Sequence, residues 1–101
     1  MEALKIKLRQ FAEERNWGQY HSPKNLATAL MIEAAELAEH FRWLTQDQSY
    51  DLDSQQLEKV CDEVGDILIC LINFSDKFDI DPLQCAETKI EKNRIKYPAG
   101  K

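Results

Sequence analysis

Apolar residues recur along the chain at the three- and four-residue spacing of amphipathic helices. This period and the capping residues predict four helices, at about residues 4–16, 23–44, 57–78 and 82–97. The second and fourth open at Ser22-Pro23 and Asp81-Pro82, where a side chain able to cap a helix precedes a proline suited to its first turn. Polar residues 45–56, between the two longest helices, are expected to form a flexible loop.

Short connections between these helices favour an antiparallel four-helix bundle, so the predicted fold class is all-α. The chain of 101 residues is expected to form one domain, residues 1–101. In the second and third helices, apolar residues cover more than the roughly 100° arc that a surface helix needs. We therefore expect other copies of the chain to complete the bundle, in an obligate homo-oligomer.

Charge and cysteine content narrow the functional classes. A net charge of −5 argues against general binding to a nucleic-acid backbone, but allows a small phosphorylated ligand held through a metal. The three cysteines, without CxxC spacing, fit a reduced, cytoplasmic setting. The longest apolar run, ILICLINF, falls short of the roughly 20 residues that span a bilayer, so no membrane association is expected.

Acidic residues interrupt the apolar faces of the two longest helices. Because each residue turns a helix by about 100°, Glu33 lies about 20° and Glu36 about 80° from the stripe through Leu26. Glu63 and Asp66 repeat this arrangement on the third helix. Carboxylates beside an apolar core lose solvation energy unless a positive charge meets them. The pattern therefore predicts a counter-charge at this place.

A divalent cation is the simplest counter-charge for these four carboxylates. The cations nearest in sequence, Arg42 and Lys59, fall mostly away from the groove. An all-oxygen set selects a hard ion, Mg2+ or Mn2+, rather than zinc. A di-iron bundle would need Glu-x-x-His pairs, whereas His40 stands four residues after Glu36. A single acidic pair is usually solvated, as we expect for Glu39, but two pairs on the most apolar helices favour a metal site.

The segments IEAAELAEHFRW and DEVGDILICL resemble the E-x-x-E plus E-x-x-D signature of the MazG-like all-α nucleoside triphosphate pyrophosphohydrolases. The likeness is greater to the dCTP pyrophosphatase branch, and FAEERNWGQYHSPKNLATAL and KIEKNRIKYP extend it over nearly the whole chain. The resemblance implies cleavage of a deoxynucleoside triphosphate to the monophosphate and pyrophosphate, in nucleotide-pool house-cleaning. It also implies a homotetramer built as a dimer of dimers.

The resemblance also assigns roles to individual residues. The residues that match the family's Mg2+ ligands are Glu33, Glu36, Glu63 and Asp66, and two of these, Glu36 and Glu63, are candidate catalytic residues. The residues that match its base-and-sugar segment are Trp17, Gln19, Tyr20, His21 and Trp43. Indole and phenol faces suit this role because they stack on a base.

Further polar residues suit the rest of a nucleotide. Lys89 and Asn93 share a helical face and suit the triphosphate tail, although cations near a helix C-terminus also favour its dipole. Asn25, one turn into the second helix, is placed to donate to phosphate or sugar.

Two positions depart from the dCTP branch and leave the base preference open. Leu8 and Cys70 stand where that branch carries a histidine and a tyrosine that touch the nucleotide, so dUTP or a damaged base is also a candidate. Ile32 replaces an acid found in some wider members, which leaves the number of metal ions open. The alternative from another class is a non-catalytic helical assembly or nucleotide-sensing module.

Overall fold

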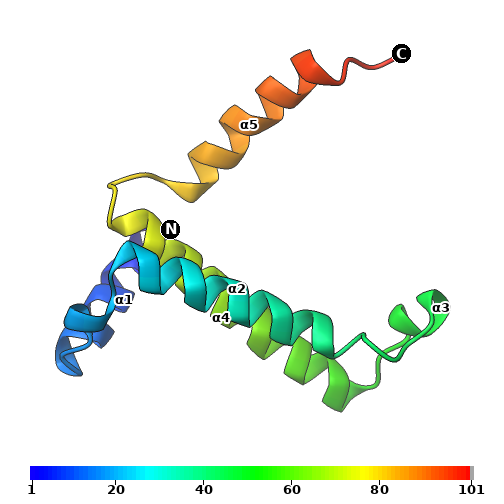
Figure 1. Ribbon diagram of the computed structural model, residues 1–101, viewed down its shortest axis with the longest axis horizontal. Helices are drawn as coiled ribbons and strands as arrows, with labels where there is room; N and C mark the ends of the chain where they lie inside the picture. The colour runs from blue at the N-terminus through cyan, green and yellow to red at the C-terminus, as the bar shows by residue number, and fades with distance from the viewer. Residues whose placement is uncertain (101) are drawn as a thin grey trace.

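The computed structural model describes residues 1–100, and every regular element in that range is helical. The elements are α1 (Glu2–Glu14), the 3-10 turn η1 (Gly18–Tyr20), α2 (Pro23–Glu39), α3 (Gln46–Ser49), α4 (Ser54–Asp76) and α5 (Pro82–Lys96) (Figure 1). The all-α prediction is confirmed. The predicted domain ends at Lys101, which lies outside the described residues.

The helix starts follow the capping residues read from the sequence. Ser22 Oγ accepts a hydrogen bond of 3.1 Å from the Asn25 amide. Asp81 Oδ1 accepts one of 2.9 Å from the amide of Leu83. Each bond satisfies an amide that the first turn of a helix otherwise leaves without a partner. These caps fix where α2 and α5 begin.

The predicted end of the second helix at Leu44 is wrong, because α2 ends at Glu39. From His40 to Arg42 the amides bond three residues back rather than four, so the chain tightens into turns. Phe41 and Leu44 remain half-buried on this turn. The apolar stripe therefore continues past the helix end, which is why the apolar period alone predicted too long a helix.

The segment 45–56 is more ordered than the flexible loop we expected. Thr45 and Gln48 form a capping box that opens α3, with bonds of 3.1 and 2.9 Å between side chain and amide. Asp53 and Gln56 form a second box, so α4 begins at Ser54, three residues before the predicted start. A T-x-x-Q or D-x-x-Q pattern carries this signal in the sequence.

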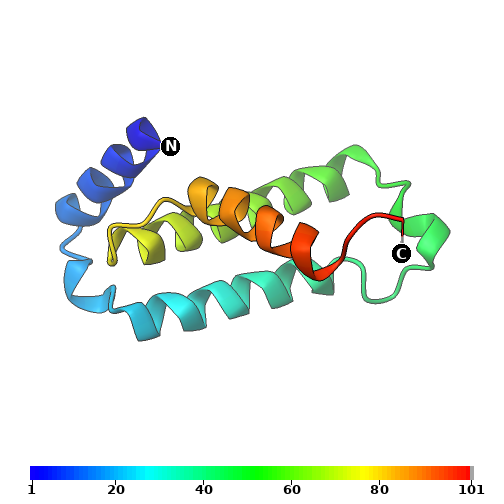
Figure 2. The same ribbon diagram turned by 90° about the horizontal axis from the view of Figure 1, so that it is seen from above.

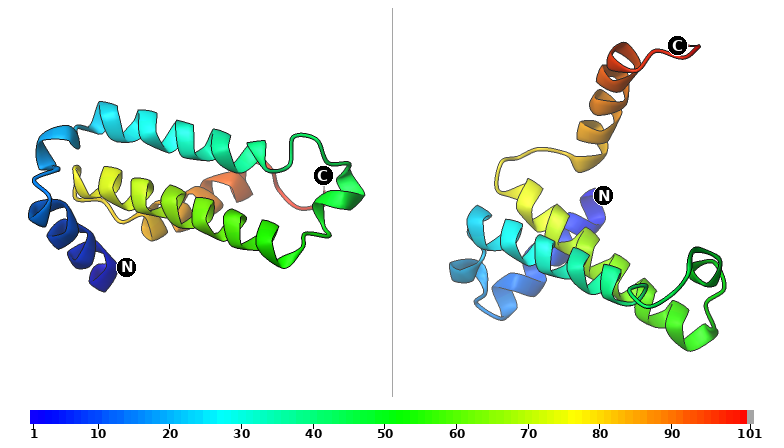
Figure 3. Two further views of the ribbon diagram at one scale, coloured as in Figure 1. Left: turned by 90° about the horizontal axis from the view of Figure 1, so that it is seen from below. Right: turned by 45° about the vertical axis from the view of Figure 1, so that its right-hand side comes forward.

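Two antiparallel helices, α2 and α4, lie side by side and form the centre of the chain (Figures 2 and 3). Helix α1 packs on α4 at the end where α2 starts, α3 lies at the opposite end, and α5 points away from the pair (Figure 1). The radius of gyration is 16.8 Å, against about 13 Å for a compact domain of this length. A single chain is thus an open structure.

The core of one chain is small. Leu26 and Ile72 are the buried apolar residues of the described range. Large apolar side chains remain exposed on every long helix, including Met31, Val64 and Ile95. Most apolar surface is therefore uncovered in the isolated chain.

An ion pair fastens α1 to the end of α4. Arg9 Nε donates to Asp76 Oδ2 at 2.7 Å, and the second guanidinium nitrogen bonds Oδ1. Lys5 Nζ lies 3.5 Å from the same carboxylate. The hydrogen bond from Arg9, with the charges of Arg9 and Lys5, lowers the pKa of Asp76 below its ordinary value. The two-pronged geometry fixes the orientation of α1.

Replacing Asp76 by asparagine is expected to reduce the free energy of unfolding slightly at neutral pH. Because the pKa of Asp76 is lowered in the folded chain, its contribution is present above the ordinary value of 3.8 and lost as the pH falls through the lowered one. Urea unfolding of Asp76→Asn and wild type should thus converge in strongly acidic buffer. Glu14→Gln, which removes a 70% exposed carboxylate, is the control; equal stability of Asp76→Asn and wild type at neutral pH would contradict this account.

Candidate functional site

Three carboxylates from the central helices meet in one cluster. Glu33 and Glu36 from α2 and Glu63 from α4 each offer an oxygen, and these atoms lie within 4.8 Å of one another. We call these three residues the acidic cluster. Glu33 and Glu63 are half-buried, whereas Glu36 is exposed. The antiparallel contact of α2 and α4 brings Glu63 together with acids 30 and 27 residues before it in sequence.

Two oxygens of the acidic cluster are buried without a hydrogen-bond partner in the described chain, Glu33 Oε2 and Glu63 Oε2. Burial raises the pKa of Glu33 to about 7, and the neighbouring carboxylates, Glu36 first among them, add to this effect. Buried carboxylate oxygens without partners are rare, because they lose the hydrogen bonds of water. Oxygen donors of this kind fit a hard divalent cation.

Asp66, the fourth predicted ligand, lies one helical turn after Glu63 but is exposed and outside the group of three. Its charge still raises the pKa values of Glu33 and Cys70, which places it near the acidic cluster. Its role as a ligand remains a prediction.

One basic group contacts the acidic cluster, and the sequence reading did not identify it. His40 Nε2 lies 3.7 Å from Glu63 Oε1, an ion-pair distance longer than a hydrogen bond. The sequence could have indicated His40 through its spacing of four residues from Glu36, since that spacing places the two side chains on one side of a helix. Arg42 instead pairs with the exposed Glu39 at 3.4 Å, in line with our expectation that both point away.

An aromatic groove of about 460 Å³ lies between α1, η1, α2 and α4. Five of the predicted substrate-binding residues line it: Trp17, Tyr20, His21, Asn25 and Cys70. Leu8, one of the two departures from the dCTP branch, lines it as well. Burial and then the charges of Glu33 and Asp66 raise the pKa of the Cys70 thiol. The aromatic groove therefore adjoins the acidic cluster at Cys70.

One chain does not bring the other predicted substrate-binding residues into the aromatic groove. Gln19 is turned back, and its Nε2 donates to the carbonyl of Asn16 at 3.1 Å. Trp43 is 81% exposed beside Arg42, past the end of α2 opposite to Trp17. A helix of 17 residues is about 25 Å long, so Trp17 and Trp43 cannot enclose one base within a chain.

Lys89 and Asn93 also lie away from the acidic cluster, on the projecting helix α5. Lys89 lines a separate shallow cavity together with Thr88 and Lys92. The predicted contact of Lys89 and Asn93 with a triphosphate thus has no counterpart inside one chain.

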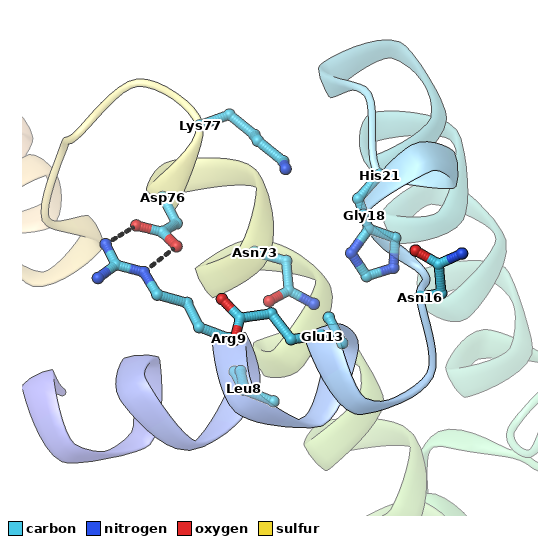
Figure 4. Close-up of a pocket in the computed structure, with 10 residues that line it drawn as sticks. Leu8, Arg9, Glu13, Asn16, Gly18, His21, Asn73, Asp76 and Lys77 are labelled. Atoms are coloured by element: carbon cyan, nitrogen blue, oxygen red, sulfur yellow. Dashed lines mark hydrogen bonds and ion pairs between the residues drawn. The ribbon is translucent and has the colours of Figure 1, made fainter.

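A second cavity of about 350 Å³ lies behind the aromatic groove, and its lining side chains are shown in Figure 4. Its polar lining includes Arg9, Glu13 and Lys77. Leu8, Ala12, His21 and Asn73 line both spaces and form the wall that they share. Asn73 was not singled out from the sequence, because it lies inside the apolar run of the third predicted helix.

Comparison with known proteins shows similarity between this chain and pyrophosphatases. No family model matches the chain. It is 36% identical over 92 residues to human dCTP pyrophosphatase 1 and 35% identical over 91 residues to the rat protein. These alignments cover 89% and 88% of the chain, but the chain spans only about half the length of these relatives, 54% in each case.

A solved pyrophosphatase from Archaeoglobus fulgidus is similar over nearly its whole length. It shares 40% identity and a TM-score of 0.92, covering 97% of this chain and 92% of that one. The fold and these comparisons define the class, which is that of the all-α pyrophosphatases. The chain belongs to the MazG-like family of these proteins. None of the described helices is both long and apolar enough to cross a bilayer.

The raised pKa of Glu33 predicts how stability depends on pH without divalent cations. The folded chain holds a proton on Glu33 that the unfolded chain releases above 4.5, so stability falls as the pH rises from 4.5 to about 7. Thermal unfolding in a chelator should show this decline for the wild type and a weaker one for Glu33→Gln. The exposed Glu39→Gln is the control, and identical pH dependence of Glu33→Gln and wild type would contradict the assignment.

Proposed function

We propose that this chain is a Mg2+-dependent deoxynucleoside triphosphate pyrophosphohydrolase, which cleaves its substrate to the monophosphate and pyrophosphate. The observation that carries the proposal is the acidic cluster, with two buried and unpartnered carboxylate oxygens, at the edge of an aromatic groove. The similarity to dCTP pyrophosphatases supports it.

The acids would hold the cation that a triphosphate needs. Glu33, Glu36 and Glu63, with Asp66 beside them, are the ligands we assign to Mg2+, and Mn2+ has the same preference for oxygen. When bound, the ion would neutralise phosphate charge as the anhydride bond is cleaved. Without it, the carboxylates would repel the triphosphate.

Two acids of the cluster have distinct places in the proposed reaction. Glu36 is exposed, so its carboxylate is open to accept a proton from the attacking water, and we assign it as the general base. One oxygen of Glu63 lies at ion-pair distance from His40, and the other is buried without a partner. We assign Glu63 a catalytic role through this arrangement.

The aromatic groove would hold the base and sugar. Its volume of about 460 Å³ lies within the usual range for small-molecule sites. Trp17 and Tyr20 offer ring faces for stacking. Asn25 Nδ2 is engaged with the Tyr20 carbonyl at 3.0 Å, which leaves the Asn25 oxygen for the ligand. We propose dCTP or a related or modified deoxynucleotide as the substrate.

We propose that a second chain completes the site, in a homotetramer arranged as a dimer of dimers. The open shape and uncovered apolar surface of one chain support this assembly. A neighbouring chain would supply Trp43 to the base and Lys89 and Asn93 to the triphosphate, since one chain holds all three away from its own groove.

A nucleotide panel with Mg2+ tests the proposed reaction. The wild type should release pyrophosphate and the monophosphate from at least one pyrimidine deoxynucleotide. Glu63→Gln should lower kcat by about 100-fold or more, the loss expected when a charge-positioning group is removed. Glu58→Gln, an exposed acid near the start of α4, is the matched control. No release from any nucleotide, or full activity of Glu63→Gln, would favour the non-catalytic assembly or sensing module.

Light scattering tests the assembly. The mass should be four times the 11.8 kDa of one chain. Ile95 is 84% exposed on α5, and Ile95→Asp should dissociate the tetramer and reduce turnover together, because a charge disfavours a buried interface. Glu87→Gln, on an exposed position of the same helix, should change neither. A fully active monomer would overturn the shared site.

A further inference from the structure

Four polar positions follow one face of α4 from the acidic cluster into the aromatic groove. They are Glu63, Asp66, Cys70 and Asn73, spaced by three, four and three residues. Glu63 belongs to the acidic cluster, whereas Cys70 and Asn73 line the aromatic groove. This face therefore runs from the proposed phosphate end of a nucleotide toward its base end.

Asn73 is the uncommitted polar side chain at the far end of this face. It is half-buried and has no side-chain hydrogen bond to any of residues 1–100. Its neighbour Asp76 is already engaged by Arg9 at 2.7 Å (Figure 4). The Asn73 amide stands in the wall shared by the aromatic groove and the second cavity. Its donor and its acceptor are both available to a ligand.

The spacing along α4 suits a nucleotide. Asp66 and Asn73 are seven residues apart, about 10 Å along the helix axis. This rise is comparable with the span from the α-phosphate of a nucleotide to the pairing edge of its base. The pairing edge is the part of a pyrimidine farthest from the phosphates, so it would reach Asn73 rather than Cys70.

We propose that Asn73 reads the pairing edge of a pyrimidine and accepts cytosine and uracil alike. The inference rests on the proposed function and specifies its substrate class as pyrimidine deoxynucleotides. Cytosine presents an amino donor beside a ring-nitrogen acceptor, and uracil presents a carbonyl acceptor beside a ring N–H. An asparagine amide carries one acceptor and two N–H donors, and turning it over matches either order.

No hydrogen bond within residues 1–100 holds the Asn73 amide in one orientation. Leu8, across the same groove, carries no hydrogen-bonding group. Cys70 offers only a thiol, which is a weak donor, and burial raises its pKa, which keeps it protonated. His21 lines the same wall, but neither it nor any other of residues 1–100 is hydrogen-bonded to the Asn73 side chain. Because a bond that held the amide in one orientation would select one base, an unbonded amide is expected to accept both.

The test compares kcat/KM for dCTP and dUTP in the full chain with Mg2+. The wild type should use both within about tenfold of each other. Asn73→Leu, similar in size but without polar atoms, should lower both by about 10- to 100-fold, the usual cost of losing a two-bond base contact. Asn73→Asp keeps the shape but loses the donor, so it should lower both as well. Gln55→Leu, an exposed amide on α4 outside the groove, is the control.

The outcomes separate this inference from the proposed function. Preference of the wild type for one base by more than about 100-fold, or unchanged values in both Asn73 variants, would overturn the role of Asn73 and leave the hydrolase intact. Absence of hydrolysis with every nucleotide would overturn the hydrolase instead. Calorimetric titration with dCMP and dUMP would then decide the inference: binding of both, weakened in Asn73→Leu, supports it, and any other result overturns it.

Discussion

Electrostatic repulsion among three convergent carboxylates is the constraint on which the rest of the structure depends. Glu33, Glu36 and Glu63 offer oxygens within 4.8 Å of one another, and two of these residues have a buried oxygen without a partner. The described chain provides only His40 at ion-pair distance, 3.7 Å from one of them. Burial and then the neighbouring like charges raise the pKa of Glu33, and a bound cation would oppose both effects. The fold therefore holds an arrangement whose natural complement is a metal ion.

The same two helices that create this cluster leave the chain incomplete. Helices α2 and α4 contact each other closely, but α5 projects from them and few side chains are buried. A site with its acids in one chain and Trp43, Lys89 and Asn93 directed elsewhere is consistent with the proposed assembly. Assembly and substrate binding would then be coupled, because the apolar contacts that bury α5 would also deliver those side chains.

The sequence predicted the fold class, the caps at Ser22 and Asp81, and three of the four acids as neighbours, because helical period and capping depend on local spacing. The sequence predicted the end of α2 too late, at Leu44, because the apolar pattern continues through the turns that follow the helix. Contacts between helices could not be predicted from local spacing, because they join distant residues. The hydrogen bond of Arg9 to Asp76, for example, joins residues 67 positions apart. The separation of Trp17 from Trp43 also follows from helix length and direction, which a family motif does not convey.

The departures from the dCTP branch gain a physical meaning in the aromatic groove. Leu8 and Cys70 both line it, so the positions that differ from the family pattern are those that face the proposed base. Since Leu8 is apolar and the Cys70 thiol is a weak donor, the proposed hydrogen bonds to the base would come from Asn73, one turn further along α4. In the proposed account the metal ligands come from both α2 and α4, whereas base choice would lie further along α4.

The central claim is that the acidic cluster is a cation site of the chain itself, and direct Mn2+ binding in the absence of nucleotide tests it most directly. Electron paramagnetic resonance should show saturable uptake of Mn2+ by the wild type and by Glu39→Gln, whose side chain lies outside the cluster. Uptake should weaken by about 10-fold or more in Glu33→Gln, which removes a charged ligand. Equal uptake by Glu33→Gln and wild type, or none by either, would contradict the account.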